Sequence, residues 1–156
     1  MLVIGITSRA LFDLDLSHDI FTKEGLESYR SFQISNENVP LKPGRAFPLV
    51  KKLLSLNNQI DGKRSVEVIL LSRNSSDTGL RIFNSIEHHN LDIKRAVFCS
   101  GGSPHSYAKS FGAHLFLSTE TSDCRSSIKN GVASARIFPS SAPFSADNAL
   151  KVAFDG

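Results

Sequence analysis

Short apolar runs recur along this chain and alternate with segments of helical spacing. Strand-length apolar runs lie at 2–6, 66–71, 95–99, 114–117, 135–138 and 150–154, and helical patterns at 17–34, 46–56, 78–89, 105–111 and 121–130. Runs that are apolar on both faces are typical of strands buried inside a parallel sheet. The alternation therefore predicts an α/β fold, a three-layer sandwich with a mainly parallel, Rossmann-like sheet and right-handed crossovers.

The same patterns predict details within the helices. Ser17 suits the N-cap of one helix that runs to about Ile34. In the helix expected from Thr78 to His89, the spacing places Leu80, Phe83 and Ile86 toward the core.

Composition excludes several classes of protein. The 156 residues are the length of one ordinary domain, and no apolar run approaches the roughly 20 residues of a membrane span. Two cysteines exclude a disulfide scaffold and fit a reducing compartment, which favours the cytoplasm. The net charge of +3 is spread along the chain, and there is no Trp, so nucleic acid is a poor first candidate. An anionic small substrate and a homo-oligomer remain open.

Polar residues follow the expected strands where a parallel sheet binds its ligands, beyond the carboxyl ends. These segments are 7–9, 72–74, 100–103, 118–119 and 155–156, and they are rich in hydroxyls and glycines. The loop of Ser72, Arg73 and Asn74 precedes a helix, so its hydroxyl and the first helical N–H groups suit a phosphate. An ordinary N-cap in a solvated loop is the alternative.

Acidic residues occur in two patterns of interest. Asp13 and Asp15 have the Asp-x-Asp form of phosphatases that make an aspartyl-phosphate, but Asp13 lies seven residues beyond Ile6, so a surface turn is favoured. Asp155 directly follows the apolar run 150–154 and suits a catalytic carboxylate better, with a plain C-terminal carboxylate as the alternative. His88 and His89 point in different directions on a helix, which argues against a metal pair.

Several long blocks of the chain, in order, resemble the cytosolic 5′-nucleotidase type I family. They are Ile4–Phe12, Asn36–Pro48, Leu70–Asn74, Thr78–Ile86, Gly101–Pro104, Lys109–Phe111 and Leu115–Ser118. That family belongs to the haloacid dehalogenase superfamily of phosphohydrolases. The resemblance implies a haloacid dehalogenase-like fold, a cytoplasmic location and Mg²⁺-dependent hydrolysis of nucleoside 5′-monophosphates such as AMP.

The resemblance also implies roles for single residues. Val152–Gly156 matches the start of the family's catalytic Asp-Gly-Asp motif, which makes Asp155 the expected nucleophile and Mg²⁺ ligand. The residues before it resemble a degenerate copy of the catalytic half, with Ile6 and Ser8 in place of the two acids. Ser72 keeps the phosphate-binding hydroxyl and Lys109 the neutralising position, while Ser118 and Thr119 replace metal-binding acids.

The expected organisation follows from that comparison of halves. Residues 1–138 are expected to form a pseudo-catalytic α/β half, 139–149 a linker, and 150–156 the first strand of a truncated catalytic half. Ser72, Arg73, Asn74 and Lys109 are the expected substrate-binding residues. Such an N-terminal half is expected to be inactive alone. The alternative is a complete, non-catalytic α/β module that binds a nucleotide or a protein.

Overall fold

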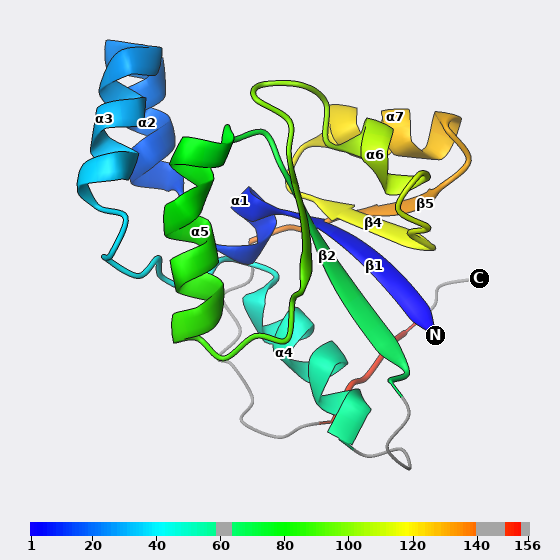
Figure 1. Cartoon of the computed structure of the whole chain (residues 1–156). Helices are drawn as coiled ribbons and strands as arrows, with labels where there is room; N and C mark the ends of the chain where they lie inside the picture. The colour runs from blue at the N-terminus through cyan, green and yellow to red at the C-terminus, as the bar shows by residue number, and fades with distance from the viewer. Residues whose placement is uncertain (59–63, 140–148, 154–156) are drawn as a thin grey trace.

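A five-stranded parallel sheet forms the centre of the molecule (Figure 1). The computed structural model describes residues 1–58, 64–139 and 149–153. The strands are β1 Leu2–Thr7, β2 Val66–Ser72, β3 Arg95–Phe98, β4 Leu115–Ser118 and β5 Ala133–Arg136. Their order is β3-β2-β1-β4-β5, and every neighbouring pair is parallel. The predicted α/β fold with a parallel, Rossmann-like sheet is confirmed.

Helices cover both faces of the sheet. They are α1 Ser8–Leu11, α2 Asp15–Glu24, α3 Leu26–Ser35, α4 Phe47–Ser55, α5 Ser76–His88, α6 His105–Ala108 and α7 Thr121–Lys129. Successive strand side chains point to opposite faces, so Ile4 and Ile6 pack in one core cluster with α4 and α5. Val3 packs in a second cluster on the other face, with Ala108 of α6. The two clusters are the two interfaces of a three-layer sandwich.

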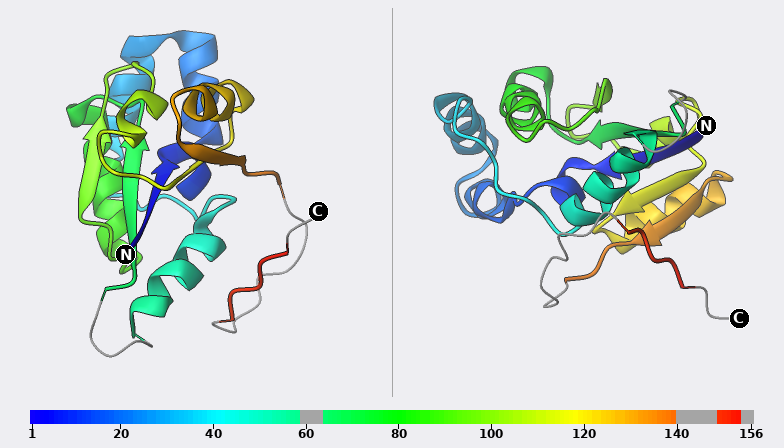
Figure 2. Two further views of the ribbon diagram at one scale, coloured as in Figure 1. Left: turned by 90° about the vertical axis from the view of Figure 1, so that its right-hand side faces the viewer. Right: turned by 90° about the horizontal axis from the view of Figure 1, so that it is seen from below.

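Helices α2 and α3 form a hairpin at the carboxyl ends of the strands. Figure 2 shows it at the opposite end of β1 from the N-terminus. The single helix expected at 17–34 is wrong, because Gly25 breaks it with a φ of 87°. That conformation is open to glycine and strained for most other residues. Ser17 is therefore not an N-cap but lies buried within α2, where its hydroxyl donates to Gln33 Oε1 at 3.4 Å.

The buried face of α5 differs from the predicted one. Ile86 is buried as expected, but Leu80 and Phe83 are each 43% exposed. Arg81 takes the place of an apolar residue in the interface, because its guanidinium donates to Val39 O at 2.9 Å and Gln33 Oε1 at 3.0 Å. The face that α5 buries thus depends on hydrogen bonds of Arg81, which a pattern of apolar residues cannot predict.

The C-terminal part of the chain departs furthest from the expected strands. β5 starts two residues earlier than expected and ends at Arg136, so that Phe138 is exposed. Residues 150–153 form no strand, contrary to the strand expected at 150–154. Phe154, Asp155 and most of the expected linker lie outside the described residues. The division at 139–149 and 150–156 therefore stays a prediction.

Candidate functional site

A cavity of about 1030 Å³ lies between the strand ends and the α2–α3 hairpin. We call it the carboxyl-edge cavity. Its lining includes Thr7, Ser8, Arg73, Asn74, Ser118 and Thr119 from the strand ends, and Leu14, Phe21, Leu26 and Tyr29 from the hairpin and the residue before it. Two of the predicted substrate-binding residues, Arg73 and Asn74, are thus brought to one cavity.

The serines at the ends of β1 and β2 are bonded to each other. Ser8 Oγ and Ser72 Oγ lie 3.0 Å apart, and both residues are buried. Ser72 Oγ also accepts the N–H of Asn74 at 3.2 Å. Ser72 does not line the cavity. Its hydroxyl, predicted to hold a phosphate, is thus engaged within the protein.

Ile6 offers no reactive group to a substrate either. Its side chain is fully buried in the larger core cluster. With Ser8 at the other acid position of the resemblance, the end of β1 carries no carboxylate.

A part-buried ion pair joins the loop after β2 to the first turn of α7. Arg73 Nη2 donates to Asp123 Oδ1 at 2.5 Å, and the Asp123 side chain is only 4% exposed. The Ser118 hydroxyl lies 3.5 Å from Asp123 Oδ2, and His105 Nδ1 lies 3.8 Å from Oδ1. The sequence analysis missed Asp123. Its place in the first turn of α7, where the helix dipole favours a carboxylate, was the available signal.

Asn74 links the sheet to the hairpin. The Tyr29 hydroxyl donates to Asn74 Oδ1 at 2.5 Å, and burial raises the pKa of Tyr29, which keeps the phenol protonated as a donor. Asn74 Nδ2 is buried with no partner among the described residues. The same holds for Thr7 Oγ1 and Thr119 Oγ1, which also belong to the cavity lining.

Two predicted site residues do not reach the cavity. Lys109 follows α6 as an exposed residue and does not line it. The short helix α6 ends at Ala108, which packs on the sheet, so Lys109 follows it at the surface. Asp155 lies outside the described residues.

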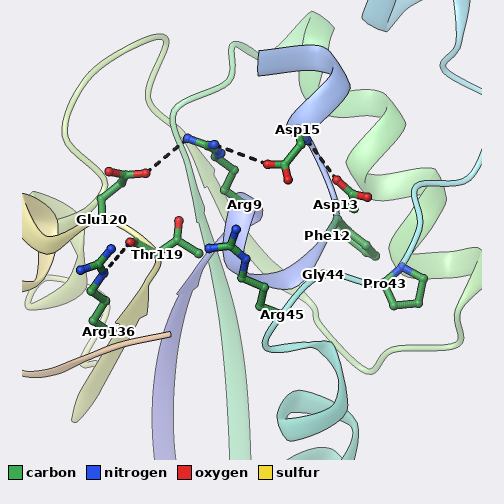
Figure 3. Close-up of a pocket in the computed structure, with 10 residues that line it drawn as sticks. All are labelled: Arg9, Phe12, Asp13, Asp15, Pro43, Gly44, Arg45, Thr119, Glu120 and Arg136. Atoms are coloured by element: carbon green, nitrogen blue, oxygen red, sulfur yellow. Dashed lines mark hydrogen bonds and ion pairs between the residues drawn. The ribbon is translucent and has the colours of Figure 1, made fainter. Parts of the chain in front are cut away.

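A smaller pocket of about 420 Å³ adjoins the start of α2 (Figure 3). Arg9 bridges it, with donors 3.5 Å from Asp15 Oδ1 and 3.3 Å from Glu120 Oε1. Asp13 Oδ1 accepts the N–H of Asp15 at 3.1 Å, and both acids are exposed. Asp13 and Asp15 therefore lie at the surface, as their distance from the strand predicted, but Asp15 opens helix α2 and the two do not form a turn.

The donor set at the described carboxyl ends does not fit Mg²⁺. Across residues 1–58, 64–139 and 149–153, no three His, Cys, Asp or Glu side chains gather as metal ligands. Asp123 is the buried carboxylate there, and it is neutralised by Arg73.

A ring nitrogen of His89 lies 2.8 Å from Leu41 O, and the ring packs on Phe47, which agrees with a structural role.

Comparison with known proteins adds three findings. A family model described as 5′-nucleotidase matches residues 1–156. Human cytosolic 5′-nucleotidase 1B is 34% identical over 161 residues, which cover 99% of this chain and 26% of that protein. The chain thus spans about a quarter of the length of that curated relative. The HAD domain of effector protein Lem4 from Legionella pneumophila aligns with a TM-score of 0.48 at 12% identity, over 92% of this chain and 88% of that one.

Proposed function

The chain belongs to the 5′-nucleotidase family, and on that premise we propose that it serves the hydrolysis of nucleoside 5′-monophosphates such as AMP. The observation that carries the proposal is the family match over the whole chain. The products are a nucleoside and inorganic phosphate. The cytosolic relative supports a cytoplasmic location. None of the described helices is long and apolar enough to cross a membrane.

We assign the nucleophile of this reaction to Asp155. Its carboxylate attacks phosphorus, the bond from phosphorus to the 5′ oxygen breaks, and the 5′ oxygen of the leaving nucleoside takes a proton from the second acid of the family's Asp-Gly-Asp motif. Water then cleaves the aspartyl-phosphate, which releases phosphate and restores the carboxylate. We assign Mg²⁺, which the family resemblance implies, to Asp155 and to no described residue.

We further propose that the 156-residue chain alone does not hydrolyse AMP. The described strand ends support this, because Ile6 and Ser8 occupy the positions of the two acids. Two carboxylates of the carboxyl-edge cavity, Asp123 and Glu120, are paired with arginines. No described group at the end of β1 is thus a free carboxylate nucleophile.

The test compares the isolated 156-residue chain with the native protein, each assayed separately. Phosphate release from AMP with Mg²⁺ is expected from the native protein and not from the purified 156-residue chain. Asp155→Asn in the native protein is expected to abolish the reaction, whereas Asp13→Asn, at an exposed position, leaves it intact. Turnover by the isolated chain, or by the Asp155→Asn variant, overturns the assignment.

A further inference from the structure

Three residues that line the carboxyl-edge cavity each carry a buried polar atom with no partner among the described residues. The atoms are Thr7 Oγ1, Asn74 Nδ2 and Thr119 Oγ1. Thr7 is only 6% exposed, yet it lines the cavity. Buried polar groups without partners are rare in folded proteins, because leaving them unpaired costs free energy. Their common cavity indicates that a ligand completes these hydrogen bonds.

The charged groups around the cavity are already compensated. Arginines and acids in its lining pair as Arg73 with Asp123 at 2.5 Å, Arg9 with Glu120 at 3.3 Å, and Arg30 with Asp77 at 2.6 Å. Glu27 adds a further carboxylate. A phosphate placed here would meet no free arginine in the described lining. The free hydroxyls and the amide instead suit a neutral ligand, since they form hydrogen bonds without requiring charge.

The hairpin supplies an apolar, aromatic wall. Phe21 and Tyr29 meet edge to face, with ring centroids 5.9 Å apart. Phe21 and Leu26 are 47% and 61% exposed although they line the cavity. Concave sites with an apolar wall and a few converging polar groups are typical of small-molecule binding. A flat ring is the ligand group that such a wall accommodates best.

We propose that the carboxyl-edge cavity is a metal-independent binding site for an uncharged ligand that joins a flat ring to hydroxyl groups, the chemistry of a nucleoside. Thr7 and Thr119 bond its hydroxyls, and Asn74 Nδ2 donates to an acceptor on its ring. The proposed binding requires neither Asp155 nor phosphoryl transfer. It therefore goes beyond the proposed hydrolysis and does not depend on it.

Calorimetric titration of the 156-residue chain tests this site. Adenosine, guanosine, cytidine and uridine serve as probes, each with EDTA present, beside inorganic phosphate and AMP. At least one nucleoside is expected to bind saturably at one site. Phosphate is expected to give no binding heat, and AMP is expected to bind no more tightly than its nucleoside.

Thr7→Val distinguishes a ligand contact from a structural role. The variant keeps the shape of Thr7 and removes only the unpaired hydroxyl, so the affinity for the nucleoside is expected to fall about tenfold. Thermal stability is expected to stay the same or rise, because an unpaired buried group is lost. Thr22→Val is the matched control, since Thr22 is exposed, donates to His18 O within α2 and does not line the cavity.

Three results would overturn the proposal. They are no binding of any of the four nucleosides, binding of phosphate or AMP more than about tenfold tighter than the nucleoside, and unchanged affinity in Thr7→Val. The outcome is independent of AMP hydrolysis, because binding is measured without a metal and without turnover. If the chain binds a nucleoside but the native protein does not hydrolyse AMP, only the proposed function is refuted.

Discussion

The hydroxyls of Ser8 and Ser72 lie 3.0 Å apart where β1 and β2, two neighbouring parallel strands, end. Each hydroxyl thereby finds a partner inside the protein, and Ser72 additionally accepts the Asn74 N–H. A carboxylate at Ser8 would disturb that bond. The pair explains how a strand end at a ligand-binding edge remains stable without a bound anion.

A double-mutant cycle measures the Ser8–Ser72 bond. Ser8→Ala and Ser72→Ala are each expected to lower the free energy of unfolding by about 1–2 kcal/mol, because each leaves the other buried hydroxyl short of a partner. The double variant is expected to lose about 0.5–1.5 kcal/mol less than the sum. Urea unfolding gives the four values. Strict additivity would show that the hydroxyls are not coupled, and Ser76→Ala, at an exposed site, controls for loss of a serine.

The pH dependence of stability is expected to reflect Glu67. Arg95 donates two hydrogen bonds of 2.8 Å to its carboxylate, and these bonds hold the pKa of Glu67 below its ordinary value. A lowered folded pKa contributes stability above the unfolded value and loses it as the pH falls through the folded one. Glu67→Gln is therefore expected to cost about 1–2 kcal/mol at pH 7 and progressively less below about pH 4.

Chemical unfolding of both proteins between pH 3 and pH 7 checks this, within the range where the fold persists. A difference between wild type and Glu67→Gln that stays constant with pH would contradict the prediction. Asp19→Asn serves as the control, because its ion pair with Lys23 is exposed at 3.8 Å and is expected to contribute little.

Gly44 is required by a close backbone approach. A Cβ at this position would come within 2.6 Å of the carbonyl carbon of Phe12, and Gly44 N–H donates to Leu11 O at 2.9 Å. Because backbone cannot step aside as a side chain does, Gly44→Ala is expected to cost about 2–3 kcal/mol. Gly25→Ala is the comparison, since a Cβ there meets nothing within 4 Å and only the φ of 87° is strained. A thermal melt in which Gly44→Ala matches wild type would refute the close approach.

Arg81 is expected to be irreplaceable by lysine. Its guanidinium binds Val39 O and Gln33 Oε1 and lies 5.5 Å from the centre of the Phe32 ring. A lysine ammonium lacks the planar fork that serves these partners together, so Arg81→Lys is expected to cost about 1–2 kcal/mol. Arg125→Lys, on the exposed side of α7, is expected to change unfolding by less than about 0.5 kcal/mol. Equal stability of the two variants would contradict the role assigned to Arg81.

Strands could be predicted from the sequence better than helix faces. The run that became β1 is apolar, and in β2 only Glu67 interrupts the apolar run before Ser72. Such runs are typical of strands covered on both sides, and their parallel pairing followed from the fold class. The division between α2 and α3 could not be predicted from apolar spacing, which continues across Gly25. The left-handed conformation of that glycine is set by how the hairpin packs rather than by local pattern.

The site could be predicted by location more than by contact. Arg73 and Asn74, which the sequence places at the carboxyl edge, line a cavity there, and their binding of substrate stays a prediction. Their partners were not predicted, because Asp123 and Tyr29 reach them from α7 and α3, far along the chain. Lys109 was placed by motif position alone, and the packing of α6 leaves it at the surface.

The central position of β1 has a consequence for synthesis of the protein. β1 is made before the other four strands of this sheet, yet Ile4 pairs with Val68 of β2 on one side and Leu115 of β4 on the other. At a translation rate of about 5–20 residues per second, the second neighbour emerges on the order of 5 to 20 s after β1 itself. A strand apolar on both faces thus waits half-paired on the ribosome, which is where chaperone contact with this chain is expected to concentrate.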